Sequence, residues 1–226
     1  QPAYRAVSEK IRQVILSGEL QAGDMLPTEL ELAEQFGVTR STLREAIRLL
    51  EESGIIGRAD RKRLVVTLPQ TAAVGRSVSS AMLMHRVTFK ELWQVAMGLE
   101  PLAGKLACAS ATDEDKQRLA DNLQHTETVL DDHARLLEAE IDFHNLVASA
   151  THNYALLQAR APLNDLFYPA WGAVIRALSP GQRILVAHRR VYGAICNNQP
   201  REAERWMEKH MIDFRRGIEM GNLGFD

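Results

Sequence analysis

The sequence has few cysteines and no long apolar run, and these two absences exclude several classes of protein. Its only cysteines are Cys108 and Cys196, far apart in the chain. Neither a disulfide framework nor a thiolate zinc site is therefore expected, and a reducing cytoplasm is the expected location. The longest apolar stretch, residues 92–111, is interrupted by two charged residues and a proline, so no membrane span is expected. Residues 1–20 carry charges throughout, which is not typical of a secretory signal peptide.

An overall excess of positive charge is also missing, although one segment is basic. The 226 residues include 27 Lys or Arg and 29 Asp or Glu, a formal net charge of -2. Nucleic-acid binding would therefore need a local patch. Residues 38–68 hold seven Lys or Arg and four acids, a net charge of +3, so the rest of the chain carries -5. This asymmetry favours a phosphate-facing surface near the N-terminus.

The spacing of apolar residues predicts three short helices and a hairpin within the first 68 residues. The first helix is expected at 7–17. A capping box begins the second helix, since Thr28 is followed three residues later by Glu31. The third helix, from about residue 39 to Gly54, carries its apolar residues on one face. Two short β-like runs follow and predict a hairpin. Two helices joined by a tight glycine-containing turn are typical of a helix-turn-helix, and the hairpin makes it winged.

The remainder of the chain reads as helical to its end. Helix starts are suggested at Thr88, Thr112 and Pro200. No strand alternation and no internal repeat is found there, so a bundle of six or seven helices is the simplest account. The predicted fold is therefore mainly α. A winged helix-turn-helix occupies residues 1–68, and an all-α helical bundle occupies residues 69–226.

The polar face of the predicted third helix is a candidate DNA-contacting surface. The second helix of a helix-turn-helix presents its N-terminal residues to base edges in the major groove. Arg40 and Arg44 lie one turn apart, and a guanidinium fork matches the two acceptors of guanine. A generic helical domain with a solvated charged face is the simpler alternative. The residues predicted to contact DNA are Arg40, Ser41, Thr42, Arg44, Arg48, Arg61 and Lys62.

Four residues of the second half form a candidate metal site. Glu140 and His144 are four apart on a predicted helix and share a face, and His188 and His210 lie on later helices. One carboxylate and three imidazoles can hold Zn²⁺, with Ni²⁺ or Mn²⁺ as alternatives. Asp142 is rotated about 200° from His144 on the same helix and is expected to point away. Spacing alone leaves open that each histidine is a surface or core residue.

The N-terminal motifs resemble the GntR family of bacterial regulators. The runs LPTELELA at 26–33, GVTRSTLREA at 37–46 and LEESG at 50–54 carry this resemblance, which covers about 68 residues. It implies that Arg40 and Arg44 read bases. It also implies that the hydroxyl residues Ser41 and Thr42 help to hold phosphate. It also implies that the hairpin tip enters the minor groove. Family wings usually have a glycine at the tip, and this chain has ADRK at 59–62, so contact through side chains is expected there.

The C-terminal motifs resemble the ligand-sensing FCD domain of the FadR subgroup. The run LEPLA at 99–103, the FH pair at 143–144 with a later asparagine, Asn153, and the segment 188–210 carry this resemblance over roughly residues 76–220. It implies a metal held by Glu140, His144, His188 and His210, beside a carboxylate effector, with Asn153 assigned to effector binding. The usual acid is aspartate. Family members often carry an arginine near Ala96 that pairs with the effector. Because this chain has alanine at position 96, three alternatives follow: the effector is anchored by another residue, it is not a carboxylate, or there is no effector.

Together these features predict a bacterial metabolite-responsive transcription regulator. It is expected to bind a palindromic operator in double-stranded DNA as a homodimer, because symmetric operators match two-fold proteins. A small molecule, expected to be an organic acid, would change DNA affinity, with residues 68–80 as the transmission point. Repression and activation both remain open. A metal-dependent enzyme with Glu140 as base is one alternative, and a DNA-binding regulator without an effector is another.

Overall fold

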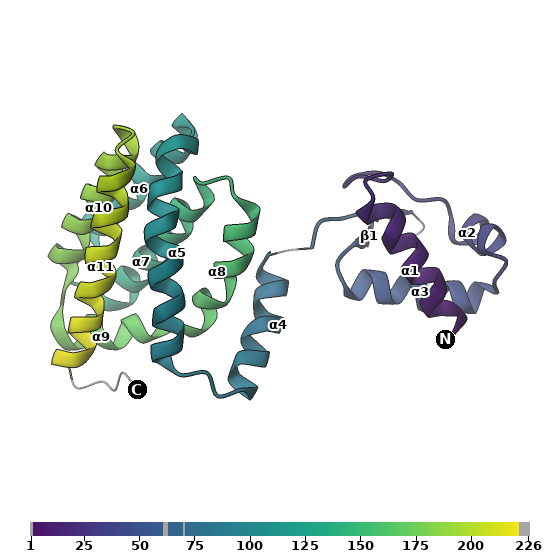
Figure 1. Ribbon diagram of the computed structural model, residues 1–226, viewed down its shortest axis with the longest axis horizontal. Helices are drawn as coiled ribbons and strands as arrows, with labels where there is room; N and C mark the ends of the chain where they lie inside the picture. The colour runs from purple at the N-terminus through teal and green to yellow at the C-terminus, as the bar shows by residue number, and fades with distance from the viewer. Residues whose placement is uncertain (1, 61–62, 70, 222–226) are drawn as a thin grey trace. The chain divides into compact units, whose positions relative to one another are not determined.

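The computed structural model describes residues 2–60, 63–69 and 71–221. The pattern of contacts divides the chain into two units, 1–73 and 74–226 (Figure 1). Each unit has a hydrophobic core of its own. The contact boundary falls after residue 73, whereas the boundary expected from the sequence falls after residue 68.

The N-terminal unit is a winged helix-turn-helix, as predicted. Strands β1 and β2 pair antiparallel, with Gly57 opposite Val65. Residues 61 and 62, at the predicted wing tip, lie outside the described residues. The elements are α1 (Ala3–Leu16), α2 (Glu29–Phe36), α3 (Arg40–Glu52), β1 (Ile56–Arg58) and β2 (Leu64–Val66).

Local hydrogen bonds fix the ends of α2 and the start of α3. Thr28 and Glu31 form the predicted capping box at the start of α2. Gly37 ends this helix with φ +62°, a left-handed conformation that a Cβ atom disfavours. Thr39 then caps α3 by accepting a hydrogen bond from the backbone N–H of Thr42. The tight turn that positions α3 is therefore specified locally.

Helix α3 buries the apolar face that its sequence predicts. Leu43, Ala46, Ile47 and Leu50 are at most 1% exposed, and they belong to a core shared with α1 and the hairpin. Because an α-helix makes one turn every 3.6 residues, these four residues lie on one face, and the opposite face, which carries the arginines, is left in solvent.

The C-terminal unit is an all-helical bundle, as predicted, but its described residues form eight α-helices rather than six or seven. A short 3₁₀ turn that contains Pro169 separates α8 from α9, a division that periodicity does not reveal. Thr88 and Thr112 are helix N-caps and Pro200 opens the last helix, as predicted. The elements are α4 (Thr71–Met84), α5 (Phe89–Ser110), α6 (Asp113–Thr128), α7 (His133–Ser149), α8 (Tyr154–Leu166), η1 (Tyr168–Ala170), α9 (Trp171–Leu178), α10 (Gly181–Cys196) and α11 (Pro200–Met220).

Four helices of the bundle surround its centre. Helix α5 packs along α11, α10 packs against both, and α7 contacts α5 and α10 (Figure 1). Unusually for a bundle core, buried polar side chains lie among these helices, and these side chains form the candidate site. No helix within the described ranges is both long enough and apolar enough to cross a membrane.

Two glycines of α10 allow a matched test of the packing. A Cβ atom at Gly181 would lie 2.7 Å from the carbonyl oxygen of Leu130, whereas a Cβ at Gly193 would meet nothing within 4 Å. We expect Gly181→Ala to lower the free energy of unfolding by about 1–3 kcal/mol. Gly193→Ala should raise it by about 0.5–1 kcal/mol, since alanine favours a helix interior. Urea denaturation of both variants measures the difference, and equal effects would contradict this packing.

Candidate DNA interface and metal centre

The predicted DNA-contacting residues that the structure describes all lie on α3, and all of them except Arg48 lie near its start. Arg40, Ser41, Arg44 and Arg48 are exposed and Thr42 is half-buried. The side chains of Arg44 and Arg48 are 67% and 66% exposed. The guanidinium groups are therefore accessible to a partner. The other two predicted residues, Arg61 and Lys62, lie outside the described residues.

Arg44 forms an ion pair with Glu29, a contact that the sequence analysis missed. Its Nε lies 3.0 Å from Oε2 of Glu29, whose other oxygen lies 3.2 Å from Nη2 of Arg58. The hydrogen bond from Arg44 holds the pKa of the Glu29 carboxyl below its usual value. This contact uses Nε, whereas a bidentate contact with guanine needs only two of the guanidinium donors. Glu29 therefore restrains Arg44 without burying it.

The start of α3 offers further groups that suit a phosphate. Oγ1 of Thr39 lies 2.9 Å from the hydroxyls of both Ser41 and Thr42. The first N–H groups of a helix and its dipole favour an anion at this end. Hydroxyls, N–H groups and arginines thus share one exposed end of α3.

The four predicted metal ligands come together in the bundle. Glu140 and His144 project from α7, His188 from α10 and His210 from α11. One possible ligand atom from each lies within 4.8 Å of all the others, and all four residues are buried. The packing of α7, α10 and α11 therefore produces the cluster that the sequence could only suggest.

The donor atoms of this cluster fit a divalent metal ion. Nε2 of His210 lies 2.8 Å from Oε1 of Glu140, and Nε2 of His188 lies 3.1 Å from Oε2 of the same carboxylate. Nε2 of His144 and Oε2 of Glu140 are buried and make no hydrogen bond among the described residues. Unsatisfied buried polar atoms are costly, and imidazole nitrogens with a carboxylate suit Zn²⁺ and similar ions.

The electrostatics of the cluster keep its carboxylate charged and one histidine neutral. Burial raises the pKa of Glu140, but the nearby His188 and His210 outweigh it and hold this pKa well below the usual value. Burial lowers the pKa of His188 to about 4, so its imidazole is in the neutral form that binds metal. Burial also disfavours the cation of His144, but the carboxylate of Glu100 raises that pKa to about 9. A metal at Nε2 would displace this proton.

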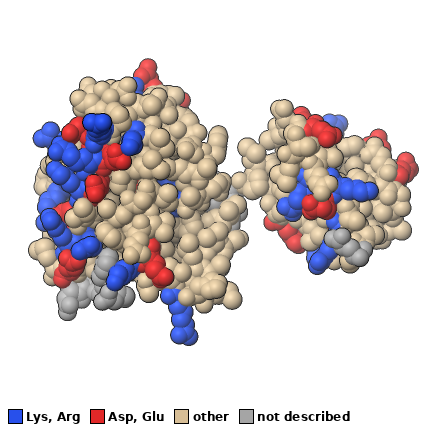
Figure 2. All heavy atoms as spheres, in the orientation of Figure 1, with Lys and Arg blue, Asp and Glu red and all other residues tan. Residues whose placement is uncertain are grey.

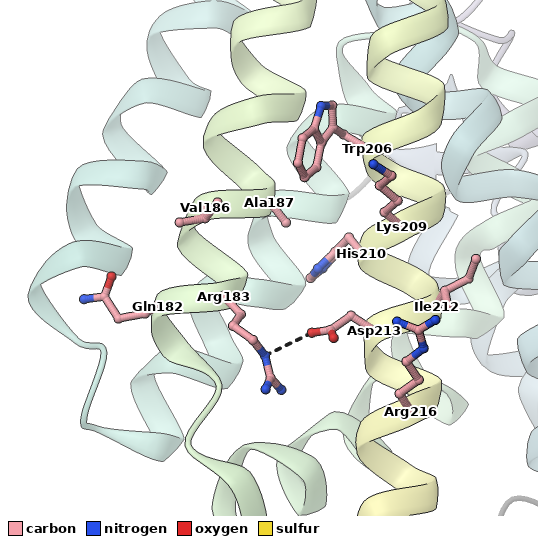
Figure 3. Close-up of a pocket in the computed structure, with 10 residues that line it drawn as sticks. All are labelled: Gln182, Arg183, Val186, Ala187, Trp206, Lys209, His210, Ile212, Asp213 and Arg216. Atoms are coloured by element: carbon pink, nitrogen blue, oxygen red, sulfur yellow. Dashed lines mark ion pairs between the residues drawn. The ribbon is translucent and has the colours of Figure 1, made fainter.

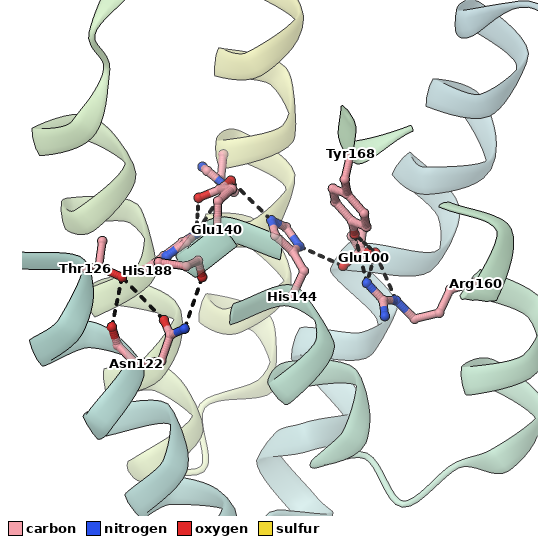
Figure 4. Close-up of polar contacts among 10 residues, drawn as sticks. Glu100, Asn122, Thr126, Glu140, His144, Arg160, Tyr168 and His188 are labelled. Carbon is pink, nitrogen blue, oxygen red and sulfur yellow. Dashed lines mark hydrogen bonds and ion pairs between the residues drawn. The ribbon is translucent and has the colours of Figure 1, made fainter. Parts of the chain in front are cut away.

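Glu100 orients His144 from inside the bundle, a role that the sequence analysis missed. This fully buried carboxylate accepts a hydrogen bond from Nδ1 of His144 at 2.8 Å (Figure 4). Its other oxygen accepts hydrogen bonds from Tyr168 and from Nη2 of Arg160, the latter at 3.0 Å. The hydrogen bond to Glu100 keeps a proton on Nδ1, so loss of the Nε2 proton to a metal would leave the Nε2 lone pair directed at the cluster. The only signal in the sequence was a charged residue inside a long apolar stretch.

Replacing Glu100 should weaken metal binding without removing a ligand. We expect Glu100→Gln to lower metal affinity by about 10–100-fold, since the partner that orients His144 loses its charge. Competition with a chromophoric zinc chelator measures this affinity. The ¹⁵N shifts of His144 report which ring nitrogen carries the proton, and a merely structural role would leave them unchanged. Glu138→Gln, an exposed position on the same helix, is the control and should match the wild type.

Three other residues of the sequence analysis have different surroundings. Asn153 caps α8, where its Oδ1 accepts a hydrogen bond from the backbone of Leu156 at 3.1 Å. Its assignment to effector binding therefore stays a prediction. Asp142 accepts a hydrogen bond from Asn122 on α6 and lies outside the cluster, as expected. Ala96 is fully buried in an apolar core.

Comparison with known protein families gives two matches. A model described as "Bacterial regulatory proteins, gntR family" matches residues 3–66. A second model, described as "FCD domain", matches residues 91–213. These two ranges lie within the winged helix-turn-helix unit and the helical bundle, respectively.

Several curated proteins resemble the chain along most of its length. The Glc operon transcriptional activator of Escherichia coli strain K12 is 28% identical, over 96% of this chain and 89% of its own length. The HTH-type transcriptional regulator LutR of Bacillus subtilis is 27% identical, over 88% of this chain and 94% of its own. The transcriptional repressor NanR of Cronobacter sakazakii is 27% identical, over 91% and 81%.

One solved structure is similar to this chain in fold. A protein described as Streptococcus agalactiae GntR superimposes with a TM-score of 0.69 and 25% sequence identity. The match covers 94% of this chain and 99% of the other. The curated relatives named above include one activator and one repressor.

Proposed function

Because the chain belongs to the GntR family of bacterial regulatory proteins, in the FadR subgroup that carries an FCD domain, we propose that it is a metabolite-responsive regulator that binds a palindromic operator as a homodimer. Its membership places it among transcription regulators rather than enzymes. The observation that carries the proposal is the exposed arginine face of α3 in the same chain as a buried Glu–His cluster.

The operator contact is assigned to the start of α3. Arg40 and Arg44 read base edges in the major groove, while Ser41, Thr42 and Arg48 bind phosphates. Arg61 and Lys62 add contacts from the wing. Two copies of the chain present two such helices to successive half-sites, which is the reason for a symmetric operator.

The cluster of Glu140, His144, His188 and His210 would hold a divalent metal, with Zn²⁺ as the first candidate and Ni²⁺ or Mn²⁺ as alternatives. Such a metal supplies positive charge and coordination positions for an anionic effector. The effector proposed is a small organic acid. It changes DNA affinity only by the difference between its affinities for the DNA-competent and DNA-incompetent arrangements, and residues 68–80 transmit that difference.

Selection of DNA from a random duplex pool tests the regulatory proposal. We expect recovery of a palindrome whose affinity falls by about 10³–10⁵-fold between about 50 and 200 mM salt, as for proteins with 6–10 phosphate contacts. Fluorescence anisotropy gives the affinities, and sedimentation gives the number of chains per duplex. Recovery of unrelated sequences, or one chain per selected site, would refute the proposal of a dimer on a palindrome.

A further inference from the structure

A groove between α10 and α11 leads from the surface to the buried cluster. The groove has a volume of about 580 Å³, and residues of these two helices line it (Figure 3). Of the four cluster residues, Glu140, His144 and His188 are 0% exposed, whereas His210 is 5% exposed and lines the groove. His210 therefore connects the cluster to this opening.

The groove is lined by more cations than acids. Arg183, Lys209 and Arg216 are exposed and line it, with Asp213 as the acidic residue. Nε of Arg183 lies 3.2 Å from Oδ2 of Asp213. Among the described residues, no carboxylate lies within ion-pair distance of Lys209 or Arg216. Lys and Arg side chains also gather over α10 and α11 as a whole (Figure 2), which together carry eight of them and five acids.

An apolar surface lies beside these charges. The indole of Trp206 lines the groove together with Ala187 and with Val186, which is 50% exposed. Nζ of Lys209 lies 4.7 Å from the centroid of the Trp206 ring. A ligand that contacts the indole therefore meets a cation at the same place, a combination that suits a molecule with an apolar body and a negative charge.

We propose that this groove binds a small amphipathic organic anion. Its apolar or aromatic body packs on Trp206 and Val186, and its anionic group pairs with Lys209 and Arg216. The assignment names the class of effector, and its regulatory meaning rests on the proposed function. Binding itself depends only on the groove.

Calorimetric titration of the full chain with 1-naphthoate tests the proposal, with the neutral 1-naphthamide as the matched ligand. We expect Lys209→Gln combined with Arg216→Gln to weaken naphthoate binding at least about tenfold, and the amide to bind the wild type at least about tenfold more weakly than the acid. The control combines Arg118→Gln with Arg135→Gln, two exposed positions on α6 and α7. This control variant has the same net charge as the groove variant, and its affinity for naphthoate should lie within about twofold of that of the wild type.

The results separate the groove from the regulatory proposal. Equal binding of acid and amide, equal loss in both double variants, or no binding at about 10 mM naphthoate overturns the groove assignment. All four substituted side chains are exposed, so we expect both double variants to fold. Thermal melts of the variants check this. Operator binding and metal content are measured on the same preparations. If these persist while the naphthoate test fails, the groove alone is wrong. Naphthoate binding by a chain that selects no operator refutes the regulator and keeps the groove.

Discussion

Arg40→Ala and Arg44→Ala should each weaken binding to the selected operator by about 1–3 kcal/mol if each side chain reads a base. Together they should reduce specific binding to the level of unrelated DNA. Both side chains are exposed at the end of α3 that enters the major groove in this fold. Anisotropy titrations with operator and scrambled duplexes measure the loss. Each single variant should lose selectivity at one base position, whereas loss of a phosphate contact weakens all sequences alike.

Two further variants test whether the ion pair between Glu29 and Arg44 contributes to operator affinity. Glu29→Gln removes the charge that holds Nε of Arg44, so we expect a smaller loss of operator affinity than for Arg44→Ala. Arg118→Ala removes an exposed cation from the helical unit and should leave operator affinity unchanged. Wild-type operator affinity in the Arg40→Ala, Arg44→Ala double variant would contradict the assignment of α3 as the recognition helix.

Removal of the carboxylate of Glu140 from the candidate metal site should have a large effect on metal affinity. The wild-type chain, purified without chelator, should contain about one equivalent of divalent metal per chain. Glu140→Gln should lower metal affinity at least about hundredfold, because the cluster loses its only anionic ligand. A metal present at about 1,000 times its dissociation constant stabilises the folded state by about 4 kcal/mol, so addition of chelator should lower the melting temperature of the wild type.

The melting temperature of the Glu140→Gln variant should then respond little to chelator. Glu138→Gln changes an exposed residue two positions earlier on α7 and should respond as the wild type does. Elemental analysis of all three proteins accompanies the melts. Substoichiometric zinc, nickel and manganese in the wild type, unchanged after refilling, would count against a metal centre.

Local features of the sequence were sufficient to predict the helix starts and the buried faces. Thr28, Thr88 and Thr112 cap helices because their side chains bond backbone N–H groups only three residues away. The exposed face of α3 followed from a period of 3.6 residues. Likewise, Glu140 and His144 could be paired because residues four apart share one face of a helix.

Tertiary packing decided which of these faces meet. The sequence could name His188 and His210 as ligands, but only the packing of α10 and α11 against α7 brings their nitrogens to Glu140. The contact of Glu100 with Arg160 joins residues far apart in the chain, and no period or motif marks such a pair.

The sequence by itself determined the mainly α architecture, the family, the exposed arginine face of α3 and the set of candidate ligands. Only the tertiary structure decided the orientation of His144 by Glu100, the restraint of Arg44 by Glu29 and the cationic groove beside His210. The physical reason is the range of the interactions. Caps and helix faces depend on neighbours within one or two turns, whereas ion pairs between helices and grooves depend on how whole helices pack.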